Sequence, residues 1–154
     1  MLLKVCWVYG ANHRDDLMQE IIARLWSAFS RYDRARKFST WMYRVALNVA
    51  IDFRRRQRRW GRETATLDEK TTEAFATSPE EAMKLQQLRE LRELLEAQSD
   101  ADRALLLLYL EGNSYQEIGE VLGMSETNVG TRLNRLKKSM RDAVQEPSDT
   151  ELGD

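Results

Sequence analysis

Apolar residues recur every three to four positions along most of the 154-residue chain, which is the spacing of one face of an α-helix. Proline occurs only at positions 79 and 147, and no valine-rich run alternates apolar and polar residues as a strand would. The pattern therefore predicts an all-α fold. Two buried helix faces are predicted in the N-terminal half, one at Leu17, Ile21, Ile22, Leu25, Trp26 and Phe29 and one at Trp41, Val45, Asn48, Val49 and Asp52.

The predicted helices fall into two groups, separated by a segment without an apolar face. Residues 64–77 are rich in threonine, alanine and acidic residues and are predicted to form a linker. Ser78, Pro79 and Glu81 then predict a helix start, because a capping serine, a proline at the first helical position and a glutamate at the third stabilise that end. Ser99 predicts the next start. The expected core of these two helices is Leu85, Leu88, Leu91, Leu94 and Leu95 together with residues 105–110.

Residues 114–138 have the pattern of a helix-turn-helix. Ser114 and Glu117 form a capping box, Gly123 can leave the first helix with a positive φ, and Ser125 is placed to cap the second helix. The expected core positions are Ile118, Val121, Leu122, Val129, Leu133 and Leu136, with Gly119 at the close approach of the two helices. The expected outward positions are Thr127, Asn128, Thr131, Arg132 and Arg135. Since arginine and asparagine can read guanine and adenine, this face predicts DNA binding; the alternative is an ordinary surface helix of a bundle.

Charge is strongly segregated along a chain whose formal net charge is only −1. Residues 31–62 carry eleven basic and two acidic side chains, whereas residues 63–102 carry four basic and eleven acidic ones. Residues 126–141 return to a formal charge of +4, and the tail from Asp142 holds five acids and no base. Such blocks indicate a polyanionic partner for the basic faces, and a basic partner or solvent for the acidic ones.

The first basic block contains aromatic residues. It runs from Phe38 to Arg44 and continues into the arginine-rich residues 54–59. A basic helix with aromatic side chains suits unpaired bases and phosphates, whereas a helix-turn-helix suits the major groove of intact duplex. A protein that holds both states of DNA is expected to take part in opening it.

Composition excludes several other kinds of site. Cys6 is the single cysteine, so an internal disulfide is excluded, and with His13 as the only histidine no zinc cluster is predicted. No metal or cofactor is expected. The single cysteine fits a reducing cytoplasm. The apolar start at residues 2–8 is interrupted by Lys4, is too short for a membrane span and lacks the small-residue cleavage site of a signal peptide, so it is interpreted as helix.

Three blocks of the sequence carry a family resemblance. They are Asp15–Glu20, Phe38–Asp52, and the run from Ser114 to Arg135. In this order they resemble the bacterial RNA polymerase sigma factors of the extracytoplasmic-function (ECF) type of the sigma-70 family. The resemblance implies a sigma-two domain at 1–62 with a shortened first helix, a flexible linker at 63–78, a winged-helix-like sigma-four helix-turn-helix domain at 79–143 and a disordered acidic tail at 144–154. The shortened helix is expected to leave Trp26, Phe29 and Trp41 less covered.

The resemblance also implies three binding surfaces. Docking on the β′ clamp helices of core polymerase is implied for Asp16, Gln19, Glu20 and Trp26. Capture of the minus-ten strand is implied for Trp41, Tyr43, Arg44, Asn48, Arg54, Arg55 and Arg58. Reading of the minus-thirty-five duplex is implied for Ser125, Thr127, Asn128, Thr131, Arg132, Arg135 and Lys138. Alternatives remain for single residues: Glu20 could lie on a solvated face, Asp16 could be only a helix N-terminal charge, Trp41 could be core, and the arginines could be a solvated helix end.

The implied function is a promoter-specificity subunit without catalytic residues. Its partners would be core RNA polymerase, through the β′ clamp helices and the β flap, promoter DNA and an anti-sigma factor, with no small-molecule substrate. One alternative is a helix-turn-helix repressor or activator that binds duplex DNA only, with a ligand or dimerisation module in its N-terminal half. Another is a nucleic-acid enzyme such as a recombinase, which needs a nucleophile or a metal site, and Asp15 and Asp16 lack a convincing third partner.

Overall fold

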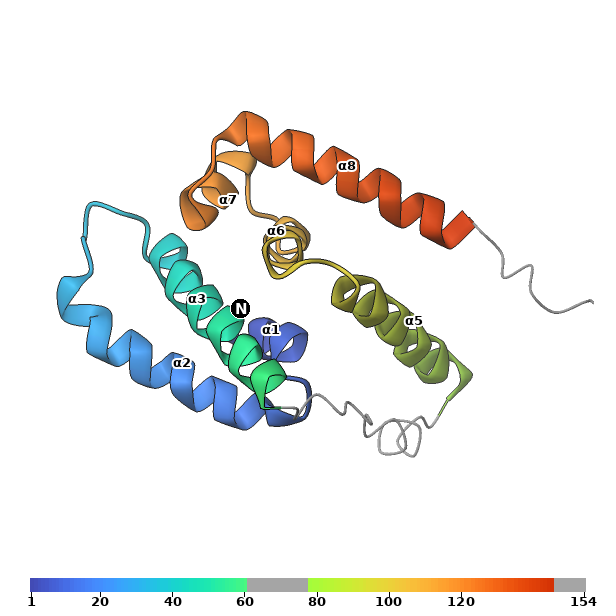
Figure 1. The fold of residues 1–154 in the computed structure, drawn as a ribbon, viewed down its shortest axis with the longest axis horizontal. Helices are drawn as coiled ribbons and strands as arrows, with labels where there is room; N and C mark the ends of the chain where they lie inside the picture. The colour runs from blue at the N-terminus through green and yellow to red at the C-terminus, as the bar shows by residue number, and fades with distance from the viewer. Residues whose placement is uncertain (61–77, 146–154) are drawn as a thin grey trace, which may run out of the picture.

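The computed structural model describes residues 1–60 and 78–145, and within these ranges every regular element is helical. The all-α prediction is therefore confirmed. The predicted linker and acidic tail lie almost wholly outside the described residues. The helices form an N-terminal unit of α1 to α3 and a C-terminal unit of α5 to α8, which lie against each other (Figure 1).

The N-terminal unit consists of three helices around a small core. α1 (Leu2–Tyr9) is followed by α2 (Arg14–Ala28) and, after a loop, by the long α3 (Phe38–Arg59). Short 3-10 turns at Ala11–His13 and Phe29–Arg31 flank α2. α2 and α3 pack along each other and α1 packs against both. Val5, Leu17, Ile21, Ala46 and Ala50 are fully buried where the three helices meet.

The predicted buried face of α3 is wrong. The structure buries Tyr43, Ala46, Leu47, Ala50 and Phe53, while Asn48 and Asp52 are exposed and Trp41, Val45 and Val49 are half-buried. At about 100° per residue, the predicted stripe lies on nearly the opposite side of the helix from the buried one. The alanines of the buried face, Ala46 and Ala50, contribute little to a hydrophobic pattern, but their small size lets α1 and α2 pack closely against α3.

The predicted face of α2 is correct only in its first half. Leu17 and Ile21 are fully buried and Leu25 is half-buried, but Ile22 and Phe29 are each 54% exposed and Trp26 is 84% exposed. α1 is short and covers only the start of α2, so the apolar residues of the later turns meet solvent. Trp26 and Phe29 are thus poorly covered as expected, whereas Trp41, for which the same was expected, is half-buried.

The C-terminal unit begins with α5 (Pro79–Glu96) and α6 (Asp100–Leu110). The predicted caps are present, since Ser78 Oγ accepts from Glu81 N–H at 3.2 Å and Ser99 Oγ accepts from Asp102 N–H at 3.2 Å. The predicted core run of α6 is buried from Leu105 to Leu108 only. Six successive residues of α6, 103 to 108, are buried, so this part of the helix is covered on all sides. Leu110 is the last residue of α6 and is 56% exposed, and Leu88 of α5 is 48% exposed.

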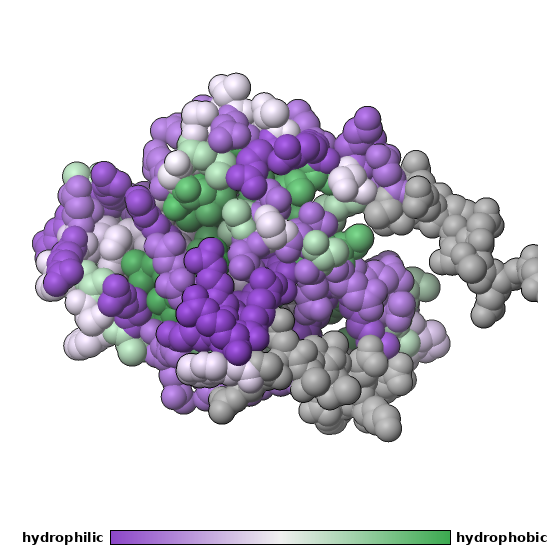
Figure 2. All heavy atoms as spheres, in the orientation of Figure 1, coloured by the Kyte–Doolittle hydropathy of each residue, from purple (hydrophilic) through white to green (hydrophobic). Residues whose placement is uncertain are grey.

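The helix-turn-helix is formed by α7 (Tyr115–Leu122) and α8 (Glu126–Gln145). Both halves of the Ser114–Glu117 capping box are present, and Gly123 adopts φ 71°. At Gly119 an added Cβ would lie only 2.5 Å from the carbonyl oxygen of Met124, so glycine is required there. Ile118, Val121, Val129, Leu133 and Leu136 are buried as predicted. Hydrophilic side chains cover most of the face shown in Figure 2, with apolar residues visible in the gaps between helices.

Candidate nucleic-acid interface

One face of α2 carries the predicted polymerase-docking residues. Asp16, Gln19, Glu20 and Trp26 fall within about a third of the helix circumference and are all exposed. The Asp16 side chain is 70% exposed and its carboxylate lies 3.6 Å from His13 Nδ1. Glu20 instead forms an ion pair with Arg56 of α3, so its carboxylate is already engaged within the unit.

An apolar hollow adjoins this face. Its volume is about 250 Å³, and its lining is Ile22, Leu25, Trp26, Phe29, Phe38 and Trp41. Exposed aromatic side chains beside polar ones are typical of a docking surface for another protein. The predicted docking face of α2 therefore combines a polar ridge with an apolar hollow, and of the residues that line the hollow the family resemblance implied only Trp26 for docking.

Trp41 belongs to a cluster of aromatic rings at the start of α3. Its ring centroid lies 5.1 Å from that of Tyr32, 5.5 Å from that of Phe38 and 6.3 Å from that of Phe29. The ring is half-buried, so it supports the loop before α3 and still lines the hollow. The ring contacts agree with the interpretation of Trp41 as a core residue, and its place in the lining of the hollow leaves part of the ring at the surface.

The remaining strand-capture candidates of α3 divide into exposed and covered residues. Arg44 and Asn48 are exposed and line a cleft of about 1280 Å³ between α3 and α7. Tyr43 is buried, at 6% exposure, and its hydroxyl donates to Glu111 Oε2 at 3.3 Å. Burial and the nearby Glu111 carboxylate raise the pKa of the Tyr43 phenol. In this arrangement Arg44 and Asn48 can meet a ligand, whereas Tyr43 cannot stack on a base.

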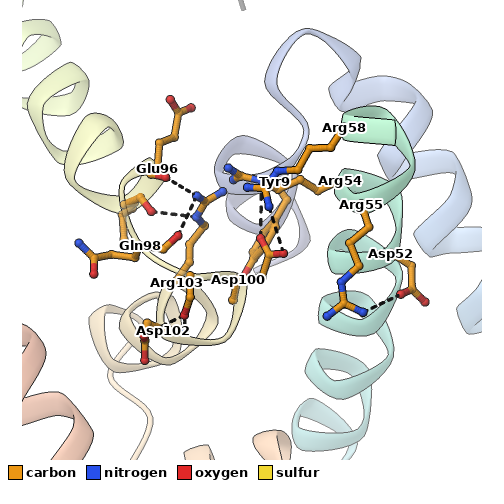
Figure 3. A network of polar contacts seen from close by, with 12 residues as sticks. Tyr9, Asp52, Arg54, Arg55, Arg58, Glu96, Gln98, Asp100, Asp102 and Arg103 are labelled. Carbon is orange, nitrogen blue, oxygen red and sulfur yellow. Dashed lines mark hydrogen bonds and ion pairs between the residues drawn. The ribbon is translucent and has the colours of Figure 1, made fainter. Parts of the chain in front are cut away.

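The basic end of α3 is engaged by the C-terminal unit. Arg54 Nε lies 3.6 Å from Asp100 Oδ1 and Arg58 Nη1 lies 3.8 Å from Asp100 Oδ2. Arg55 instead points away, with Nη1 at 3.9 Å from Asp52 within the same helix (Figure 3). Two of the predicted phosphate-binding arginines are thus paired with an acid from the other unit.

The predicted recognition helix presents most of its candidates to solvent. Ser125, Thr127, Asn128, Thr131, Arg135 and Lys138 are exposed. Arg132 is an exception to the predicted outward set, because its Nη2 lies 2.6 Å from Asp102 Oδ1 of α6 and the side chain is partly buried. Any DNA contact by Arg132 would compete with this ion pair.

Several ion pairs that the sequence pattern did not indicate join the two units. Glu117 pairs with Lys37, Glu111 pairs with Lys4, and Asp100 pairs with the α3 arginines. The hydrogen bond from Lys37, aided by the Ser114 backbone, lowers the pKa of Glu117 to about 2. No local motif predicts such pairs. The only signal in the sequence is the segregation of charge between the two halves of the chain.

Among residues 1–60 and 78–145, no group of three or more His, Cys, Asp or Glu side chains is arranged to hold a metal ion. Within the same ranges, no helix has both the length and the apolar character needed to cross a bilayer.

Comparison with known families agrees with this geometry. The model of sigma-70 region 2 matches residues 2–60, and the model of sigma-70 region 4 matches residues 88–140. These ranges coincide with the N-terminal unit and with most of the C-terminal unit.

Individual proteins of similar sequence are named as RNA polymerase sigma factors. The ECF RNA polymerase sigma factor SigX of Bacillus subtilis is 30% identical over 139 residues, which are 87% of this chain and 72% of that protein. The probable RNA polymerase sigma factor RfaY of Xanthomonas campestris is 29% identical over 140 residues, and the chain spans only 35% of its length.

A solved structure has the same fold. The sigma factor RpoE of Bartonella quintana, in complex with the anti-sigma factor NepR, superposes with a TM-score of 0.65 at 14% identity over 94% of this chain and 90% of that one. Together, the two matched regions and the SigX relative show that the chain belongs to the sigma-70 family of RNA polymerase sigma factors, in its ECF group.

Proposed function

We propose that this sigma factor directs transcription initiation by recognising two promoter elements with two separate faces. One face binds duplex DNA, and the other traps the melted strand. The observation that carries the proposal is the presence in one chain of an exposed Arg44–Asn48 face on α3 and an exposed polar face on α8. The α8 face would lie in the major groove of the minus-thirty-five element. The α3 face would hold the unpaired strand of the minus-ten element.

The chemistry of the α3 face suits unpaired DNA. Opening a duplex costs unstacking energy, which a protein recovers by binding exposed base edges and phosphates. An exposed amide such as that of Asn48 can donate to and accept from a base edge, and the Arg44 guanidinium can pair with a phosphate. Arg54, Arg55 and Arg58 would extend the phosphate contacts along α3.

The docking face of α2 would bind core polymerase. Its polar ridge of Asp16, Gln19 and Glu20 would complement a basic coiled coil such as the β′ clamp helices, and Trp26 would supply apolar anchoring. The β flap is the proposed second contact, made by the C-terminal unit. An anti-sigma factor is a further proposed partner, since the Bartonella RpoE was solved bound to one. The chain itself would catalyse no reaction and would act in the cytoplasm.

The test is transcription in vitro with core polymerase on a genomic DNA library. Start sites that share two upstream elements are expected with the chain and absent with core polymerase alone. A helix-turn-helix regulator that binds duplex only would instead retain library fragments without polymerase and would create no new start sites. That result would contradict the proposal.

Arg135→Ala is expected to weaken binding of the reconstituted polymerase to its minus-thirty-five element by about 1–3 kcal/mol and to relax specificity at one base pair. Arg132→Ala is expected to lower the thermal midpoint as well, because it removes the ion pair with Asp102. The measurement is a titration against single-base variants of the duplex, with thermal unfolding in parallel.

The matched control is Arg141→Ala, an exposed arginine nearer the end of α8. A loss from Arg135→Ala that is equal for all sequences would make this side chain a phosphate anchor. If Arg135→Ala bound every duplex as tightly as the parent does, base reading by Arg135 would be contradicted.

A further inference from the structure

We propose that Asp100, Glu111 and Glu117 form an acidic latch that holds the C-terminal unit over the strand-binding face of α3 and keeps the free chain closed. The latch carboxylates would form ion pairs with basic side chains that are proposed to bind the DNA strand, or with basic side chains next to these. The inference rests on the proposed function in one respect, which is the assignment of the α3 face to DNA.

Asp100 engages two arginines of α3. Its side chain and that of Arg54 are each 13% exposed, and the carboxylate lies within 4 Å of both Arg54 and Arg58. The Tyr9 hydroxyl donates to the Asp100 backbone oxygen at 2.8 Å, which fixes the start of α6 against α1 (Figure 3). One carboxylate therefore engages two of the arginines proposed to bind phosphate.

The other two carboxylates hold the opposite end of the interface. Glu111 pairs with Lys4 of α1 and accepts from the Tyr43 hydroxyl, and Glu117 pairs with Lys37 at the start of α3. These contacts join residues 107, 68 and 80 positions apart in the chain, so they form only when the two units lie together.

The closed arrangement opposes DNA binding at the α3 face. Arg44 and Asn48 lie on one wall of the cleft of about 1280 Å³, and Glu117 and Glu120 lie on the other. A strand that entered the cleft would bring its phosphates toward these two carboxylates, and like charges repel. The same closure keeps Tyr43 buried.

Geometry also requires the units to separate on a promoter. Elements named for positions minus ten and minus thirty-five lie about 25 base pairs apart, which is about 85 Å of duplex at 3.4 Å per step. A compact chain of this length has a radius of gyration of about 15 Å. The closed form cannot reach both elements, so promoter binding must break the latch.

Two sets of substitutions remove latch pairs from opposite sides, and both remove the Glu111–Lys4 and Glu117–Lys37 pairs, whereas only the first removes the pairs of Asp100. The first is Asp100→Asn with Glu111→Gln and Glu117→Gln, in which glutamine can still complete the capping box with Ser114. The second is Lys4→Gln with Lys37→Gln. The first set makes the chain more positive and the second makes it less positive, so a shared effect cannot come from net charge.

The readout is the distance distribution between spin labels on the full chain. Cysteines at Ser27 and Ser139 would place one label on each unit at an exposed position, and Cys6 is only 2% exposed and would not be labelled. Both substitution sets are expected to raise the population of long distances several-fold. The control, Glu80→Gln with Glu90→Gln and Glu93→Gln on exposed positions of α5, is expected to leave the distribution unchanged.

The acidic set is further expected to bind a single-stranded minus-ten oligonucleotide about tenfold more tightly than the parent, because a larger fraction of the chain is open. Distributions that stay the same in both sets would overturn the latch. Failure of the parent to bind core polymerase in gel filtration would reject the proposed function, while the label distances would still decide whether the latch exists.

Discussion

Arg103→Leu is expected to lower the free energy of unfolding of the C-terminal unit by about 2–5 kcal/mol, because it leaves buried backbone acceptors unpaired. Arg103 is 0% exposed. Its Nε donates to the Leu95 carbonyl at 2.8 Å, and its Nη2 donates to the carbonyls of Glu96 at 2.8 Å and Gln98 at 3.3 Å. The guanidinium thus supplies hydrogen-bond donors to carbonyl oxygens at the C-terminal end of α5, since the last carbonyls of a helix lack partners within the helix.

Urea denaturation followed by circular dichroism measures the effect, with Arg141→Leu on the exposed face of α8 as the control. The control is expected to change the free energy of unfolding by less than about 0.5 kcal/mol. A loss below about 1 kcal/mol for Arg103→Leu would mean that water replaces the guanidinium at the α5 end.

Trp26→Ala is expected to weaken binding to core polymerase by about 2 kcal/mol or more, roughly thirtyfold, as truncation of an anchoring tryptophan does at other interfaces. Because Trp26 is 84% exposed in the free chain, the thermal midpoint should stay nearly unchanged. The two results together would separate docking from folding. The measurement is a fluorescence titration of the labelled chain with core polymerase.

Met83→Ala is the matched control, since Met83 is also a large apolar residue, 65% exposed, but lies on α5. It is expected to bind core polymerase as the parent does. Equal affinities for Trp26→Ala and the parent would remove the apolar hollow of α2 from the polymerase interface.

Features with a local cause could be predicted from the sequence. The capping box at Ser114, the proline start at Pro79 and the turn at Gly123 depend on contacts within a few residues, and the structure has all of them. The inward set of the helix-turn-helix followed for the same reason, because two capped helices and a tight turn leave little freedom in how their faces meet.

Features set by distant partners could not be predicted. The buried side of α3 depends on where α1 and α2 lie, and its alanines gave a weak signal, so Asn48 was assigned to the inward face although it is exposed. The engagement of Arg132 by Asp102, and of Arg54 by Asp100, depends on how α6 packs against α8 and α3. Residue type and spacing identified these arginines as candidates without showing that carboxylates already hold them.

Asn48→Ala offers the most direct measurement of strand capture, which is the central claim. Asn48 is exposed, so the substitution should leave folding intact, as should the control Gln87→Ala on α5. With core polymerase on a duplex promoter, permanganate reactivity of minus-ten thymines is expected to appear more slowly with Asn48→Ala, while closed binding through α8 is nearly unchanged. A pre-melted template should restore part of the lost transcription, because its unstacking cost has already been met. If Asn48→Ala opened the duplex as fast as the parent and the control, capture of the strand by this face of α3 would be contradicted.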